Sequence, residues 1–422
     1  MRSVAFILLL LIVFACDTTR NTPDPQDNYF LRYYGGAGYQ EAIDIVTNED
    51  GSIVMLGQTR TTQEASAQVY LVKVTKSGFV QWEKTFGTDE LAKDIELSLN
   101  GYLVLSDSLH DNVSDILVRV LNEDGELIQK SSSFSYPGNF NEAGSTVTQL
   151  YDNGSPAGFI ATGYTDAPND GTNSFQGKTA IFIRFNQNGT PYTQAWINYT
   201  GTEGDDIGIR VAQVDQSLSS LKPFFFFGYF NGQSQDDLTN HSYNFWISSM
   251  SATGGGSIGT QIVMNSPTTD ERLSNVTAMN SLGNSFLLAG TTSNTTSDKI
   301  FLASQNGGPG TQTLDIDLGN LQILDESYKN VSIIPSYRSG YLVAANHVVV
   351  DNSDIILTKL DASGNNSWEN VQSFGGNGND KQTAVLELSN GRILLFGTME
   401  LGADKQSKMF LMKLNSKGQL ME

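Results

Sequence analysis

The sequence predicts an all-β fold made of seven copies of one four-stranded antiparallel unit, arranged as a β-propeller. Three observations support this prediction. One phrase, a short strand closed by a polar turn with glycine, returns seven times with drift. No segment of roughly ten residues or more has apolar side chains at helical spacing. The chain also opens with a strand, "FLRYYGG" (residues 30–36), that matches the end of the repeat rather than its beginning.

The recurring phrase marks the third strand of each unit, where alternating or apolar residues run into a tight turn. Its seven copies are "LVKVTKSG" (71–78), "LVRVLNEDG" (117–125), "FIRFNQNG" (182–189), "WISSMSATG" (246–254), "FLASQNG" (301–307), "LTKLDASG" (357–364) and "LMKLNSKG" (411–418).

The other strands of the unit are found around this phrase. A second strand precedes it and ends in glycine in five units, as at Gly57 and Gly163. A first strand with a small residue at its start, such as Ala42, comes before that, as expected where strands converge on one axis. The fourth strand is a motif such as "VQWEKTFG" (80–87). The units recur about every 56 residues, and four short strands in a repeat of roughly 40–50 residues are typical of a β-propeller.

The two ends of the chain are predicted to build the last unit together. The seventh repeat stops at "GQLME" (418–422), where its fourth strand should begin. The orphan strand at residues 30–36 can supply that strand, and closing the ring in this way removes exposed sheet edges. Residues 29–422 are therefore predicted to form a single propeller domain.

The N-terminal leader predicts a lipid-anchored protein. Arg2 precedes the apolar run "VAFILLLLIVF" (residues 4–14), which is too short to span a bilayer but has the length of a signal-peptide core. Ala15 and Cys16 follow. We expect residues 1–15 to be a lipoprotein signal peptide, Cys16 to carry the lipid, and residues 16–28 to be a polar tether. The alternative is an ordinary secreted protein that keeps a free thiol.

Composition limits the possible ligands. The chain has 25 Lys and Arg against 45 Asp and Glu, a net charge of −20, which disfavours nucleic acid as a partner. Cys16 is the single cysteine, which excludes an internal disulfide framework. No HExxH or GxSxG motif occurs, and nothing singles out a pair of carboxylates. These observations predict no cofactor, no metal site and no enzymatic activity.

Phrases in the first unit carry a resemblance to a known group. "DGSIVMLGQT" (50–59), "YLVKVTKSG" (70–78) and "QWEKTFG" (81–87) resemble the repeats of propeller lipoproteins common in the outer membranes of Bacteroidota. The resemblance implies a seven-bladed propeller anchored by lipid in the outer membrane, on its periplasmic or its surface side. It does not imply an activity, since such folds serve many roles.

Candidate site residues lie on the connections between fourth and first strands and between second and third strands. These connections are the longer and more varied ones, and variable loops on a rigid scaffold are where binding usually occurs. An acid recurs at every junction of fourth and first strands: Glu41, Glu90, Glu142, Asp206, Glu271, Glu326 and Asp380. These acids could form a ring of charge at the channel mouth that holds a cation or basic peptide, or they could bind backbone amides locally. The candidate binding face is Tyr136, Phe140, Glu142, Phe175, Asp206 and Tyr243.

The leading functional hypothesis from the sequence is a non-catalytic docking or ligand-binding platform beside an outer-membrane transporter or assembly complex. The anchor, the rigid ring and the lack of a catalytic motif motivate it. One alternative is a glycan-binding surface lipoprotein, since Tyr136, Phe140, Tyr164, Phe175 and Tyr243 offer rings on which sugars could stack. The third is a carboxylate-based polysaccharide lyase or hydrolase.

The anchor can be tested directly. We expect Cys16→Ser to move the protein from the membrane fraction to the soluble fraction, because the thiol is the only attachment point for the lipid. Fractionation and metabolic labelling with a fatty acid measure this. Cys16→Ser protein that stays in the membrane fraction would contradict the prediction.

Overall fold

The computed structural model describes residues 29–128, 132–134, 140–166, 177–191, 198–200, 204–214, 217–219, 224–231, 243–250, 261–262, 270–278, 285–293, 298–306, 311–316, 331–337, 339–349, 352–402 and 405–421. Every regular element in these residues is a β-strand, and the strands form seven four-stranded antiparallel sheets. The prediction of an all-β, propeller-like fold is confirmed.

The sheets are named here in chain order. Sheet one consists of β2 (Tyr39–Thr47), β3 (Ile53–Arg60), β4 (Gln68–Val74) and β5 (Val80–Phe86). Sheet two consists of β6 (Glu90–Ser98), β7 (Gly101–His110), β8 (Val113–Asn122) and β9 (Ser132–Phe134). Sheet three consists of β10 (Glu142–Asp152), β11 (Ser155–Thr165), β12 (Thr179–Phe185) and β13 (Asn198–Thr200). Sheet four consists of β14 (Asp205–Gln213), β15 (Phe224–Asn231), β16 (Asn244–Met250) and β17 (Gln261–Ile262). Sheet five consists of β18 (Asp270–Ala278), β19 (Ser285–Ser293), β20 (Asp298–Asn306) and β21 (Thr311–Ile316). Sheet six consists of β22 (Val331–Pro335), β23 (Tyr341–Val349), β24 (Asn352–Leu360) and β25 (Gln372–Phe374). Sheet seven consists of β26 (Lys381–Glu387), β27 (Ile393–Leu401), β28 (Gln406–Leu414) and β1 (Phe30–Tyr34).

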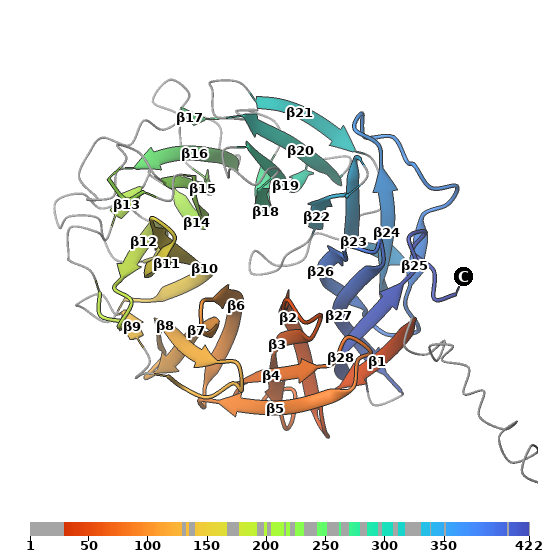
Figure 1. The fold of residues 1–422 in the computed structure, drawn as a ribbon, viewed down its shortest axis with the longest axis horizontal. Helices are drawn as coiled ribbons and strands as arrows, with labels where there is room; N and C mark the ends of the chain where they lie inside the picture. Colours follow the sequence, from red (N-terminus) through yellow and green to blue (C-terminus); the bar gives the residue numbers. More distant parts are fainter. Residues whose placement is uncertain are drawn as a thin grey trace, which may run out of the picture.

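The seven sheets stand around a common centre, with the first strand of each sheet innermost (Figure 1). Each first strand contacts the first strand of the next sheet, and β26 contacts β2 in the same way. The tight turns that follow third strands use the expected chemistry. At the end of β28, Asn415 Oδ1 accepts the amides of Lys417 and Gln419 at 2.8 and 3.0 Å, and Gly418 takes a φ of 74°.

The innermost strands carry a repeated bulge close to their start. The pairing of first and second strands shifts register at Ala42/Asp44, Ala92/Asp94, Gly144/Thr146, Gly208/Arg210, Leu273/Asn275 and Gln382/Ala384. The glycine expected at the end of five second strands lies within the strand, as Gly57 does in β3, and it is explained by this bulge. A Cβ at Gly57 would meet the carbonyl oxygen of Glu41 and the sulfur of Met409. The small residues predicted at the inner strands therefore coincide with a bend in the backbone.

Backbone amides near the bulge are satisfied by the preceding sheet. Thr398 Oγ1 accepts the amide of Ala42 at 2.9 Å, and Asp107 Oδ1 accepts that of Gly144 at 2.7 Å. Asn346 Oδ1 accepts the amide of Gln382 at 2.9 Å. In each case a side chain near the end of a second strand reaches the next sheet, so hydrogen bonds as well as apolar contacts join neighbours.

The hydrophobic core is divided among the contacts between sheets. The described residues form seven buried clusters, and each draws its members from two neighbouring sheets. The aromatic side chains are concentrated between sheets three, four and five, where Phe182 packs edge-to-face against Phe226 at 4.3 Å between ring centroids. Each sheet is therefore held mainly by its two neighbours.

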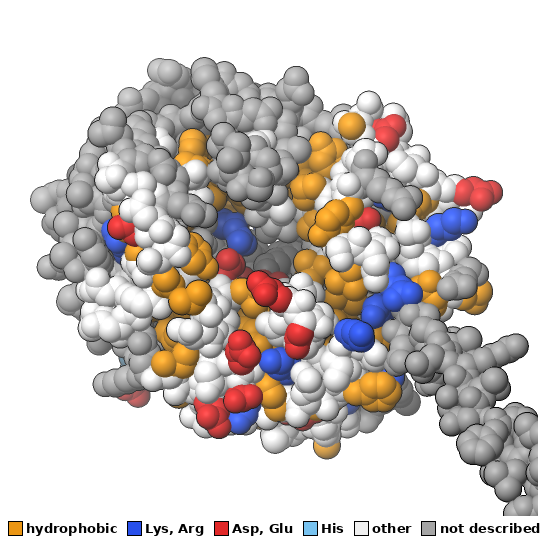
Figure 2. All heavy atoms as spheres, viewed as in Figure 1, with side chains coloured by type: hydrophobic (Ala, Val, Ile, Leu, Met, Phe, Trp, Pro, Cys, Tyr) orange, Lys and Arg blue, Asp and Glu red, His pale blue; other side chains and the backbone are white. Residues whose placement is uncertain are grey.

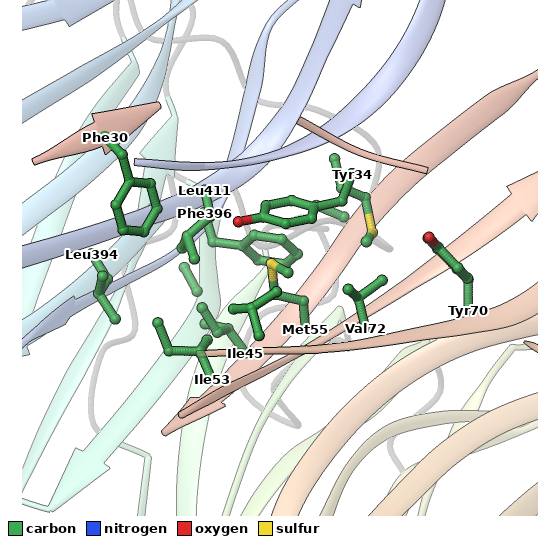
Figure 3. Packing of buried hydrophobic residues seen from close by; sticks show 14 residues of the cluster. Phe30, Tyr34, Ile45, Ile53, Met55, Tyr70, Val72, Leu394, Phe396 and Leu411 are labelled. Atoms are coloured by element: carbon green, nitrogen blue, oxygen red, sulfur yellow. The ribbon is translucent and has the colours of Figure 1, made fainter. Parts of the chain in front are cut away.

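The cluster between sheets seven and one joins the two ends of the chain (Figure 3). β1 pairs with β28 from Phe30 opposite Lys413 to Tyr34 opposite Met409, so the N-terminal strand completes the sheet built by the last three strands. Tyr34 is buried, and its hydroxyl donates to the carbonyl of Gly78 in sheet one at 2.9 Å. Lys413 Nζ donates to the carbonyl of Lys76 at 2.7 Å.

Two substitutions in β1 can test this joint. We expect Tyr34→Ala to lower the free energy of unfolding by about 3–5 kcal/mol, the usual cost of deleting a large buried ring. Leu31→Ala is the matched control, because Leu31 lies on the same strand and is 36% exposed, whereas Tyr34 is 4% exposed. Denaturant unfolding measures both. Equal small losses for the two variants would show that β1 does not stabilise sheet seven.

Candidate functional site

A cavity of about 560 Å³ lies at the centre of the disc, at the end where first strands begin and second strands finish. We call it the central cavity. Its charged lining side chains are Glu41, Arg60, Lys93 and Lys178, and Tyr164 is its aromatic one. Figure 2 shows basic and acidic side chains beside one another around the central hollow. The bulged strands bring these residues together, because β2, β6, β10, β14 and β18 all contribute to the wall.

Two of the cations are held by nearby groups. Lys93 Nζ lies 3.1 Å from Asp107 Oδ2. Burial raises the pKa of Asp107, and the charge of Lys93 opposes that rise. Lys178 Nζ lies 4.7 Å from the centre of the Tyr164 ring, a cation–π contact. The Lys93 ammonium is therefore paired with a buried carboxylate, and the Lys178 ammonium lies over an aromatic ring.

A second cavity, of about 510 Å³, lies between sheets one and seven; we call it the side cavity. It shares Glu41, Gln58 and Arg60 with the central cavity. Lys381, Lys405, Glu400 and Tyr39 line only the side cavity. Gln58 Nε2 donates to Glu41 Oε2 at 2.6 Å, which fixes the carboxylate at the boundary between the two.

The linings of the central and side cavities together have an excess of basic residues, whereas the whole chain has an excess of acidic ones. They contain five basic side chains and two acidic ones, whereas the whole chain has 25 basic and 45 acidic residues. A concave surface with an excess of positive charge attracts anionic ligands, and low-dielectric walls strengthen that attraction.

A third cavity, of about 300 Å³, has Asp44, Arg210 and Asn275 among its lining residues, all on inner strands. Arg210 Nη2 lies 3.4 Å from Glu96 Oε2. Burial alone would lower the pKa of Arg210, but Glu96, Asp94 and Asp44 outweigh it and raise the pKa. Asp94 Oδ2 also accepts the amide of Val147 at 2.9 Å. Near the axis, the single guanidinium of Arg210 therefore lies among three carboxylates.

The predicted acidic positions are mostly buried, and their carboxylates bond within the protein. Glu90 pairs with Arg119 at 2.6 Å. Glu142 accepts from Thr165 at 2.9 Å, and Asp380 accepts the amide of Gly376 at 2.7 Å. Asp206 and Glu271 are also buried, with 1% of each residue exposed. Of the seven positions Glu41 lines a cavity, and Glu326 lies outside the described residues. This placement corresponds to the local interpretation of the acids rather than to a solvent-facing ring.

The structure brings together few residues of the predicted binding face. Glu142 and Asp206 are buried, and Phe140 and Tyr243 are half-buried. The centre of the Tyr243 ring lies 4.2 Å from Arg272 Cζ, a cation–π contact, and 5.7 Å from the centre of the Tyr229 ring. Tyr136, Phe175 and the lipid-attachment candidate Cys16 lie outside the described residues.

Sequence reasoning missed the cations of the two cavities. Arg60 ends β3, Lys93 is the extra residue of the bulge in β6, and Lys178 directly precedes β12. These positions meet at the same end of the disc as the junction acids. A comparison of side chains at strand ends, extended from acids to bases, would have identified them.

Within the described ranges, no group of three or more His, Cys, Asp or Glu side chains could hold a metal ion. No helix among these residues is long and apolar enough to cross a membrane.

Comparisons with known proteins give fold likenesses only. No family model and no curated protein matches the chain. Among solved structures, prolyl oligopeptidase B from Galerina marginata is similar with a TM-score of 0.47 and 11% identity over 88% of this chain. This chain spans about half of it, 51%. The polysaccharide lyase Uly1 is similar with a TM-score of 0.47 and 8% identity, over 91% of each chain. The NanB sialidase from Streptococcus pneumoniae has a TM-score of 0.42 and 11% identity, over 95% of this chain and 72% of its own.

The hypothesis of a non-catalytic docking platform is wrong by this comparison. The similar folds named above belong to a peptidase, a lyase and a sialidase, and no described contact supports a docking role. At these identities the likeness concerns the fold alone and assigns none of those activities to this chain.

Asp380 offers a test through pH. Burial raises its pKa to about 6, and the charges of Asp354 and Glu400 add to the rise, while the amides of Gly376 and Glu400 oppose it. The folded state therefore binds this proton more tightly than the unfolded state, whose Asp pKa is about 3.9. Asp380 destabilises the fold above pH 6, and that cost should disappear as the pH falls toward 4.

We accordingly expect wild-type protein to gain stability relative to Asp380→Asn between pH 7 and pH 4.5, measured as the difference in unfolding free energy at each pH. Glu64→Gln, which removes one charge from an exposed residue, is the control. A wild-type minus Asp380→Asn difference that does not vary with pH would contradict the assigned shift.

Proposed function

We propose that the central cavity recognises an acidic carbohydrate, a sugar unit that carries a carboxylate or sulfate group. The observation that carries this proposal is the lining of the cavity, where Arg60, Lys93 and Lys178 outnumber the lining acid Glu41 and the carboxylate of Asp107 that pairs with Lys93. In a chain with a net charge of −20, this excess of cations is local. Charged hydrogen bonds to an anionic group are about twice as strong as neutral ones.

The remaining lining fits a sugar better than a simple anion. Gln58, Ser145, Thr146 and Ser274 offer amide and hydroxyl groups that can bond to sugar hydroxyls. Tyr164 adds an aromatic ring at the same wall. The cavity of about 560 Å³ also falls within the usual range of small-molecule sites, roughly 300–1,000 Å³.

Two finer features of the protein belong to this proposal. The seven inter-sheet clusters and the contact of β26 with β2 support a closed seven-bladed β-propeller, with each sheet as one blade. The leader and Cys16 support lipid attachment in the outer membrane of a bacterial envelope. An envelope protein in that position would meet extracellular or periplasmic polysaccharides.

Cleavage of the bound carbohydrate is the second candidate function. Glu41 and Glu400 line the same side cavity, and most glycoside hydrolases use a pair of carboxylates as acid and base or nucleophile. Glu400 Oε2 accepts the amide of Asn379 at 2.9 Å, so its carboxylate is held in position. Loss of product formation in Glu400→Gln, with binding retained, would assign it a catalytic role.

Binding can be measured by titration calorimetry with polygalacturonate as a carboxylated chain, heparin as a sulfated chain and neutral dextran. We expect one of the anionic chains to bind, with an affinity that falls as salt is added, and dextran not to bind. Arg60→Gln and Lys178→Gln should each weaken binding about tenfold, the effect of losing one charged hydrogen bond.

Lys417→Gln is the matched control, because Lys417 is exposed in the turn after β28, at the other end of the strands. Product analysis of the same mixtures tests the second candidate. Equal binding of dextran and both anionic chains, or unchanged affinity in Arg60→Gln and Lys178→Gln, would overturn the proposal.

A further inference from the structure

We infer that the ligand is a linear acidic oligosaccharide that lies across both cavities, from the centre of the disc out between sheets one and seven. This inference rests on the proposed function of the central cavity. It adds that the side cavity is a second subsite, so that the protein recognises a chain of repeating acidic units rather than a single sugar.

The first observation is the continuity of the two cavities. Glu41, Gln58 and Arg60 line both of them. The hydrogen bond of 2.6 Å from Gln58 to Glu41 lies at this boundary and holds the carboxylate against β3. Arg60 is therefore placed where a ligand that passes from one cavity to the other must run.

The second observation is that the same chemistry occurs twice. The central cavity has Tyr164 and the lysines Lys93 and Lys178 as its own residues. The side cavity has Tyr39, the lysines Lys381 and Lys405 and the carboxylate Glu400 as its own, and Glu400 Oε2 is held by the amide of Asn379 at 2.9 Å. One aromatic ring and two ammonium groups thus recur on each side of Arg60. A repeated set of binding groups fits a ligand whose units repeat, each with a ring and an anionic substituent.

The third observation concerns the backbone of the side cavity. Lys405 adopts a φ of 53°, in the left-handed region that a lysine seldom occupies. Three residues further along the chain, Lys408 Nζ donates to the carbonyls of Gly36 and Gly38 and to Gln40 Oε1, each at 2.7 Å. These three hydrogen bonds join β28 to the segment around the start of β2, where Gln40 lines the side cavity. The subsite is preformed by the closure of the ring, and preformed sites lose less entropy on binding.

Oligogalacturonates of defined length test the inference by calorimetry. If both cavities bind one chain, the affinity of wild-type protein should rise by about tenfold or more from the disaccharide to the hexasaccharide, because the second contact becomes intramolecular. The double variant Lys381→Gln/Lys405→Gln should lose most of this gain while its affinity for the disaccharide falls far less. Lys417→Gln should retain the full gain. Melting temperatures of all variants establish that they are folded.

The outcomes separate this inference from the proposed function. The disaccharide could bind, with weaker binding in Arg60→Gln and Lys178→Gln, while the affinity does not increase with oligosaccharide length. That result would leave the proposed function standing and overturn the inference of an extended chain. A length gain that persists in the double variant would also overturn it. Binding of two disaccharides per protein without a hexasaccharide gain would indicate two independent sites. No binding of any acidic oligosaccharide or polymer would overturn both proposals.

Discussion

The pairing of β1 with β28 is the contact on which the remaining structure depends. In a ring of sheets the core lies between neighbours, so each sheet is stabilised only if both of its faces are covered. Sheet seven has its inner three strands from the C-terminal end and its outer strand from the N-terminal end. Tyr34 and Lys413 also reach the carbonyls of Gly78 and Lys76 in sheet one. The same strand therefore completes one sheet and ties it to the next.

The bulge in the innermost strands explains several features that look unrelated in the sequence. Small residues at Ala42 and Ala92, and glycine at Gly57, lie where the bulged strand approaches its neighbour closely. Backbone amides near the bulge donate hydrogen bonds to side chains of the preceding sheet, such as Thr398. The bulge also alters which residues face the centre, since a bulge reverses the alternation of side chains along a strand. Cavity lining and inter-sheet bonding thus share one cause.

The distribution of charge follows from burial rather than from composition. The acidic excess of the chain suggests a negative mouth, and the recurrence of Glu or Asp at each junction strengthens that impression. Yet Glu90, Glu142 and Asp380 are buried and bonded to Arg119, Thr165 and a backbone amide. A buried carboxylate needs such partners because leaving it unpaired is costly. Cations from strand ends and from the bulge of β6 line the central and side cavities, so basic residues outnumber acidic ones in these two linings.

The sequence by itself determined the all-β class, the repeat of four strands and the pairing of the two chain ends, because alternation, turn glycines and an orphan strand are local signals. It also determined where small residues must stand, although the bulge that requires them could not be inferred. Only the tertiary structure decided which charges face solvent. Arg60, Lys93 and Lys178 are distant in sequence and meet only where β3, β6 and the start of β12 surround one cavity. Such a meeting depends on ring geometry and register, which no local pattern encodes.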